Sequence, residues 1–113
     1  MEITKQTVLG TLADIIDPEL HIGIVDLGLI YDVRPTKVEA SEAEDGQEGY
    51  NVEVDMTLTS VACPMGPQLR AAVHHKTESL PGVKEVIVNL IFNPPWDPRE
   101  HASEDAQMEL GIF

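Results

Sequence analysis

A strand-helix-strand pattern between residues 51 and 92 constrains the fold of this chain more than any other feature. Apolar and polar residues alternate over 51–59, which predicts a strand with one buried and one wet face. An apolar stripe at helical spacing follows over about 68–80, ended by Pro81-Gly82. Residues 86–92 alternate again but carry isoleucines on the opposite face, which predicts an enclosed, central strand. Such a unit crosses over right-handedly, so its two strands should run parallel.

The residues before this unit predict one helix and one further strand. Val8, Leu9, Leu12, Ile15 and Ile16 form a single helical stripe over 4–16. Thr4 is the expected N-cap, and Pro18 should end the helix at about Asp17. A strand is expected from Leu29, with Leu29, Tyr31 and Val33 on one face, and Pro35 either interrupts it or marks a sheet edge.

The sequence also predicts the loops between these elements and a last helix. Residues 39–49 carry carboxylates and glycines without apolar periodicity, which is typical of a solvated hairpin loop. The proline-rich run 93–98 should form a loop, because each proline removes an amide donor. Ser103 is expected to cap a last short helix that Gly111 ends. The expected fold is therefore an α+β two-layer sandwich over one domain, 1–113, with element order helix-strand-strand-helix-strand-helix and a small mixed sheet.

Charge and composition exclude several functions. The formal net charge is -13, from 20 acidic and 7 basic side chains, so nucleic acid and anionic membrane surfaces are not expected partners. The acidity fits salt adaptation, solubility or an acidic docking surface. No apolar run reaches the ~18 residues of a membrane span, and the start does not resemble a signal peptide. With 1 cysteine, Cys63 should be a free thiol in a reducing cytoplasm.

Cys63 is the leading candidate for chemistry. It follows the polar end of the 51–59 strand and precedes a helix start, where unpaired amides and the helix dipole stabilise a thiolate. Such a thiol is suited to metals, sulfur or electrophiles. The alternative is a small buried cysteine that only packs.

Several polar side chains are candidates for the surroundings of this thiol. Asp17 and Glu19 flank Pro18 at the unfavourable end of the first helix dipole, so they either share a site or lie solvated in a turn. Thr57 and Thr59 should point their hydroxyls the same way from the polar face of the strand. Asp26, between apolar neighbours, is expected to bond turn amides ahead of Gly28.

The histidines do not predict a metal centre. His74 and His75 are adjacent on a helix and point about 100° apart, so they cannot chelate as an i, i+4 pair does. His21 and His101 are scattered in the sequence. A preformed four-ligand site within one chain is therefore not expected, and no nucleotide-binding or hydrolase motif occurs.

Taken together, five motifs resemble the MIP18-like (DUF59) family and its SufT-like iron-sulfur assembly accessory proteins. These motifs are Asp17-Pro18-Glu19-Leu20, Ile24-Val25-Asp26-Leu27-Gly28-Leu29-Ile30-Tyr31, Met56-Thr57-Leu58-Thr59-Ser60 with Cys63-Pro64, Pro81-Gly82-Val83 and Pro94-Pro95-Trp96. The resemblance implies a fold like that of iron-sulfur cluster assembly domains and a role in maturing iron-sulfur proteins. It also implies that Asp17, Glu19, Thr57, Thr59 and Cys63 form the site. Many relatives have proline where this chain has Val61 and glycine where it has Ala62.

One thiolate supplies one ligand, whereas iron-sulfur clusters typically need four. A transient cluster would thus be shared between two chains or completed by a partner, which favours a carrier or adaptor over an enzyme. The expected partners are assembly machinery and client apoproteins, or a second copy in a homodimer. A PaaD-like factor that matures a multicomponent oxygenase is the alternative role. A thiol enzyme with Cys63 as nucleophile and Asp17 or Glu19 beside it is the third.

Overall fold

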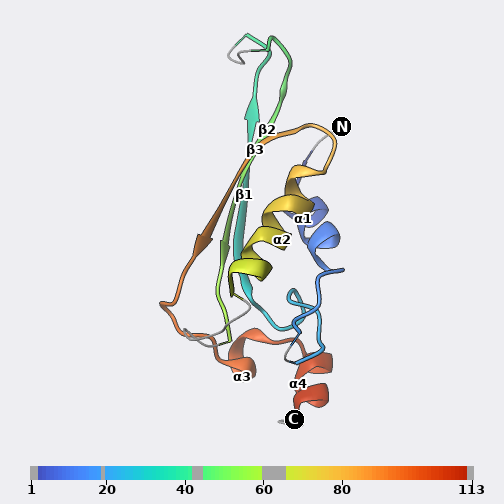
Figure 1. Ribbon diagram of the computed structural model, residues 1–113, viewed down its shortest axis with the longest axis vertical. Coiled ribbons are helices and arrows are strands. Elements are labelled where there is room, and N and C mark those ends of the chain that lie inside the picture. The colour runs from blue at the N-terminus through green and yellow to red at the C-terminus, as the bar shows by residue number, and fades with distance from the viewer. Residues whose placement is uncertain (1–2, 19, 42–44, 60–65, 112–113) are drawn as a thin grey trace.

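The computed structural model describes residues 3–18, 20–41, 45–59 and 66–111. Over these ranges the chain forms an α+β fold in which helices cover one face of a small sheet (Figure 1). The elements are α1 (Lys5–Leu12), β1 (Ile30–Val38), β2 (Gly49–Met56), α2 (Gly66–Glu78), β3 (Val83–Leu90), α3 (Pro98–His101) and α4 (Glu104–Leu110). This confirms the expected fold class and adds α3, which the sequence did not predict.

The sheet has the order β1-β2-β3. β1 and β2 pair antiparallel as a hairpin, and β2 and β3 pair parallel through α2, as predicted. The prediction that the third strand is central is wrong, because β2 is the middle strand and β3 lies at an edge. Apolar residues on both faces of β3 misled that interpretation, since Ile87 lies on the open face and is 55% exposed.

The core lies between the sheet and the pair α1 and α2 (Figure 1). Thr4 caps α1 by accepting a hydrogen bond from the Thr7 amide, as expected. The helix ends earlier than predicted, at Leu12, so Ile15 is buried whereas Ile16 is 51% exposed. The buried contribution of the sheet comes from alternate residues, as the period-2 pattern requires. These are Val33, Val52, Val54, Met56 and Val88.

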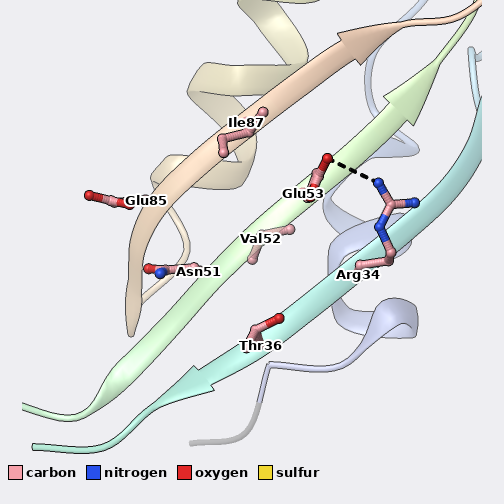
Figure 2. A pocket seen from close by; sticks show the side chains of 7 residues that line it. All are labelled: Arg34, Thr36, Asn51, Val52, Glu53, Glu85 and Ile87. Carbon is pink, nitrogen blue, oxygen red and sulfur yellow. Dashed lines mark ion pairs between the residues drawn. The ribbon is translucent and has the colours of Figure 1, made fainter. Parts of the chain in front are cut away.

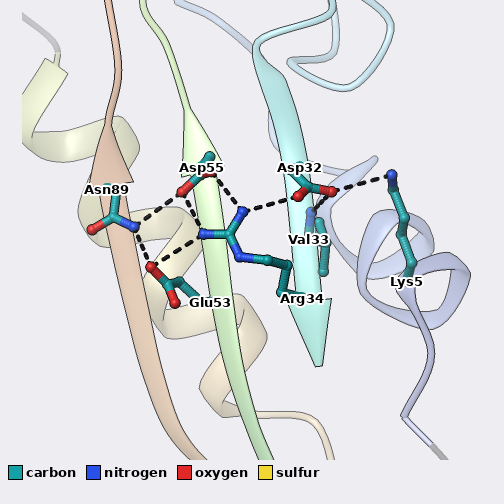
Figure 3. Close-up of polar contacts among 7 residues, drawn as sticks. All are labelled: Lys5, Asp32, Val33, Arg34, Glu53, Asp55 and Asn89. Atoms are coloured by element: carbon teal, nitrogen blue, oxygen red, sulfur yellow. Dashed lines mark hydrogen bonds and ion pairs between the residues drawn. The ribbon is translucent and has the colours of Figure 1, made fainter. Parts of the chain in front are cut away.

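The opposite face of the sheet carries a network of charged side chains centred on Arg34 (Figure 3). Its guanidinium donates to both carboxylate oxygens of Asp55, at 2.7 and 3.0 Å, and to Asp32 at 2.9 Å. Glu53 lies 3.1 Å from the guanidinium, and Asn89 of β3 donates to Glu53 and Asp55. The network therefore crosses all three strands.

The hairpin continues through Pro35, which resolves the alternatives left by the sequence. Pro35 lies opposite Val52 in the register, on the outer strand of the sheet. A proline there costs no ladder hydrogen bond when its nitrogen faces the sheet edge. Pro35 therefore marks the edge and does not interrupt β1. No helix among the described residues is both long and apolar enough to cross a membrane.

Candidate functional site

The candidate site lies where β2 ends and the chain turns toward α2. Cys63 and Glu19, two of the predicted site residues, are outside the described residues. The segments on either side of Cys63 are described, and they meet. A Cβ added to Gly66 would lie 2.7 Å from Leu58 Cδ1, so the start of α2 packs directly on the residue that follows Thr57.

Thr57 occupies this end of β2 with its side chain fully buried. The prediction that Thr57 lies on a wet face with Thr59 is wrong in this respect, because β2 ends at Met56 and both Thr57 and Leu58 are buried. The Thr57 amide donates to the Leu29 carbonyl oxygen, at 2.8 Å. Its hydroxyl makes no hydrogen bond of good geometry within the described part of the chain, although it lies near enough to the Tyr31 hydroxyl to lower the pKa of that phenol. An unsatisfied buried hydroxyl is costly, so it calls for a partner or a role. Thr59 is half-buried.

Asp17 is also buried, at 1% exposure, which removes the alternative of a solvated carboxylate. Its Oδ1 accepts a hydrogen bond from the Leu20 amide at 3.0 Å. Its backbone closes the same loop, because its amide donates to Ile22 and its carbonyl accepts from His21. The loop amide thus supplies the stabilisation that the helix dipole does not.

A ladder of backbone hydrogen bonds connects the Asp17 loop to Thr57. The amide of Ile24 donates to Ile15, the amide of Leu29 to Ile24, and the amide of Thr57 to Leu29, at 2.8 to 3.0 Å. The structure therefore ties the two predicted segments to one end of the sheet through the loop 15–29. This connection runs through backbone groups and does not involve the side chains of Asp17 and Thr57.

Tyr31 and His101 also belong to this end of the molecule, although the sequence did not single them out as site residues. The Tyr31 hydroxyl donates to the Pro94 carbonyl oxygen at 2.9 Å. Its ring lies 5.0 Å from the His101 ring, centroid to centroid. Burial raises the pKa of the Tyr31 phenol, and the nearby Thr57 hydroxyl acts in the opposite direction. Tyr31 thus links the resembling motifs at 24–31, 56–60 and 94–96.

The position of His101 follows from a local signal. Asp97 caps α3, accepting from the Arg99 amide, and Pro98 stands in the first turn of this helix. One turn later the His101 Nδ1 accepts from the Asp97 amide at 2.9 Å. An aspartate, a proline and a histidine at this spacing are a recognisable short-helix pattern, which the reading of 93–98 as a loop overlooked.

Asp26 does not have the predicted role. The amides of Leu27 and Gly28 donate to the backbone carbonyls of Gly23 and Val25, and the Asp26 side chain is exposed. Its backbone carbonyl instead accepts from the Ser103 amide at 2.7 Å, which fastens the last helix to the loop.

No group of three or more metal-ligating side chains gathers within the described ranges. On α2, His75 is exposed, and His74 Nδ1 lies 3.8 Å from a carboxylate oxygen of Glu78.

The buried Asp17, the buried Thr57 and Tyr31 all belong to the sequence motifs that carry the family resemblance. The family model described as "Iron-sulfur cluster assembly protein" matches residues 5–89. The chain belongs to this family.

Members of the iron-sulfur cluster assembly family resemble the chain over nearly its full length. The Fe-S protein maturation auxiliary factor YitW of Bacillus subtilis is 38% identical, over 98% of this chain and 97% of its own. The maturation auxiliary factor SufT of Staphylococcus aureus is 41% identical, over 87% and 98%. The crystal structure of a DUF59 domain from Bacillus anthracis superposes with a TM-score of 0.77 at 37% identity, covering 96% of this chain and 92% of that one.

Proposed function

We propose that this chain is an auxiliary factor in the maturation of iron-sulfur proteins and that the Cys63 thiol takes up its iron-sulfur cargo. Two relatives whose names state this role align with most of the chain, 98% in one case and 87% in the other, and this similarity supports the same role here. The chain contains 1 cysteine, which leaves Cys63 as the thiol available for this chemistry.

The contact between Leu58 and Gly66 is the observation that best supports a role for Cys63 at this end of the sheet. Because a stretch of three residues reaches at most ~11 Å, a thiol three positions before Gly66 is tethered to the end of β2. The buried Thr57 hydroxyl, unpartnered among the described residues, offers a hydrogen bond there. A hydroxyl donor would stabilise the thiolate form, which is the form that binds iron.

Asp17 and Glu19 would act from the neighbouring loop. A carboxylate close to Cys63 raises the thiol pKa but also offers an oxygen ligand to iron. This combination suits cargo that binds transiently, because the thiol is protonated again once the metal leaves. Glu19 belongs to this proposal through the family resemblance, and Thr59 and Asp26 do so as supporting residues.

Ligand number decides between a carrier and a stable metalloprotein. One thiolate leaves a cluster short of its usual four ligands, so a client apoprotein, an assembly protein or a second copy would complete it. This favours a carrier or adaptor over an enzyme, acting in a reducing compartment such as the cytoplasm. A PaaD-like role toward an oxygenase is a narrower version of the same function, differing only in the client.

Anaerobic reconstitution with ferrous iron and sulfide, followed by absorption spectroscopy, tests the cargo directly. A carrier develops a charge-transfer band that Cys63→Ser abolishes and Thr57→Val weakens. Met108→Ser, at an exposed position on α4, is the matched control and should leave the band unchanged.

A second measurement separates carrier from adaptor. The specific activity of an iron-sulfur enzyme is compared in cells carrying wild type, Cys63→Ala or no copy of this protein. Activity as low in Cys63→Ala as in the deletion supports a role for the thiol. Wild-type activity in Cys63→Ala would refute it.

A further inference from the structure

The outer edge of β3 has backbone groups that no strand pairs with in the described part of the chain. β3 is the last strand of the sheet, and its register with β2 runs unbroken from Glu85 to Leu90. The Ile91 amide donates to Met56 of β2, whereas the Val88 carbonyl faces away and accepts from Arg70 Nε at 3.1 Å. Successive residues of a strand direct their polar groups to opposite edges, so Val86 and Leu90 face outward with Val88.

The other edge of the sheet is protected, and this contrast gives the β3 edge its significance. β1 contains a register shift between Ile30 and Asp32, and Pro35 lies further along the same strand. Bulges and prolines at an edge prevent pairing with another chain. β3 has a register shift of its own between Val83 and Glu85, but beyond it Glu85–Leu90 contains neither a bulge nor a proline, and Ile87 in its middle is 55% exposed. Such an edge is a template for an added strand.

A groove of about 600 Å³ runs along this edge, between β3 and α2. Pro67, Arg70, Ala71 and His74 line it from α2, and residues 86–88 line it from β3. On the other side of β3 the sheet face is hollowed as well, with Glu85 and Ile87 beside a depression of about 230 Å³ (Figure 2). Side chains on one face of an added strand would therefore enter the groove beside α2, and those on the other face would lie next to the exposed Ile87.

Arg70 supplies a charge that this groove does not neutralise. Five of the basic side chains form ion pairs with carboxylates: Lys5, Arg34, Lys37, Lys76 and Lys84. Arg70 has no such pair among the described residues, where its side chain donates a hydrogen bond to the Val88 carbonyl oxygen. In a chain of net charge -13, an unpaired guanidinium beside an open strand edge is an attractive place for a carboxylate.

We propose that the edge of β3 binds an extended segment of a partner protein as an additional strand, with an acidic side chain of that segment reaching Arg70. Backbone hydrogen bonds to Val86, to Leu90 and to the amide of Val88 would supply affinity, since the Val88 carbonyl oxygen already accepts from Arg70, and alternate side chains would supply specificity. Apolar residues of the segment would lie beside Ile87 on the open face. Its intervening residues would face Pro67 and Ala71 of α2.

Charge favours a different protein over a second copy of this chain as the occupant. Pairing two β3 edges would bring together two chains that each carry a net charge of -13, which repel one another. The groove is lined by residues of α2 and β3 that have no part in the proposed cargo chemistry, so the proposal does not depend on that chemistry.

Capped ten-residue peptides in which valine alternates with threonine are suitable probes. One peptide has glutamate at a central threonine position, the second has glutamine there, and the third has a central proline. Binding is followed by amide chemical shifts and hydrogen exchange in the full chain. The glutamate peptide should slow exchange at Val86, Val88 and Leu90 and bind about fivefold more tightly than the glutamine peptide. The proline peptide should not bind.

Variants of the edge give the decisive comparison. Val86→Pro removes an outward amide without touching the β2 ladder, and Ile87→Lys adds a charge to the edge. Both should lose peptide binding at least tenfold, so Ile87→Lys suffices if Val86→Pro does not fold. Arg70→Gln should abolish the preference for glutamate. The controls Met108→Lys and Arg99→Gln should leave binding unchanged.

Three results would overturn the proposal. The first is unchanged exchange at Val86, Val88 and Leu90 with saturating peptide. The second is equal binding by Ile87→Lys and wild type. The third is concentration-dependent dimerisation that protects the same amides without peptide, which would assign the edge to a second copy.

Discussion

Gly28 has no room for a side chain because the backbone of His101 lies against it. A Cβ at this position would overlap the His101 carbonyl and approach its Cβ to 2.7 Å, and Gly28 also has a φ of 78°. This contact holds the C-terminal helices against the loop that leads into β1. It explains why a glycine follows Asp26-Leu27 in the motif that resembles the family.

Gly28→Ala should therefore destabilise the protein by about 2 kcal/mol or more, since a left-handed conformation alone costs an L-residue roughly 1–2 kcal/mol. Urea unfolding followed by circular dichroism measures the change. Gly10→Ala is the matched control, because nothing lies within 4 Å of an added Cβ in α1. It should stabilise by about 0.5–1 kcal/mol. Equal effects of the two substitutions would contradict the close contact at Gly28.

Trp96 anchors the same C-terminal segment through its indole. Its Nε1 donates to the Leu27 carbonyl oxygen at 2.7 Å. Trp96→Phe keeps most of the apolar contact but leaves that carbonyl unpaired, so the free energy of unfolding should fall by about 1–2 kcal/mol. Unfolding should be followed by circular dichroism, because the substitution removes the 1 tryptophan of the chain and with it the fluorescence signal. A change below ~0.3 kcal/mol would show that the bond contributes little.

The Thr57 hydroxyl makes no hydrogen bond of good geometry among the described residues, so the opposite result is expected there. Thr57→Val preserves the shape of the side chain and removes a buried polar group, so stability should stay level or rise by up to about 1 kcal/mol. Reconstitution with iron and sulfide should nevertheless weaken. Thr77→Val is the comparison, because that hydroxyl donates to the Val73 carbonyl oxygen at 2.8 Å. It should lose about 1 kcal/mol, and a similar loss in Thr57→Val would mean that its hydroxyl is bonded.

The Arg34 network predicts a specific dependence of stability on pH. Hydrogen bonds from Arg34 lower the pKa of Asp55, with Asn89 contributing, and lower that of Asp32. A carboxyl whose folded pKa lies below its unfolded value of 3.8 stabilises the fold fully at pH well above 3.8. This stabilisation is lost as the pH falls through the folded pKa.

Arg34→Gln should thus lower the urea midpoint near neutral pH, and its difference from wild type should shrink toward about pH 3. Arg99→Gln, at a guanidinium with no carboxylate partner among the described residues, should show a small difference that does not vary with pH. A constant gap for Arg34→Gln would show that the network does not set these pKa values.

The sequence by itself determined the local structure. Period-2 and helical apolar patterns specify β2, β3 and α2, and Thr4 and Ser103 specify two helix starts, because these signals depend on near neighbours along the chain. The family resemblance rests on the same short motifs. Only tertiary structure decided that β3 is an edge strand, since an exposed isoleucine and a buried one look alike in sequence.

Tertiary structure also decided how the site is assembled. Thr57 is buried because the Leu29 carbonyl and the start of α2 meet the end of β2, and His101 lies beside Tyr31 because the C-terminal segment packs against Gly28. These contacts join residues far apart in the chain. Their free energy comes from packing and hydrogen bonds formed after the sheet and helices dock, so no local pattern encodes them.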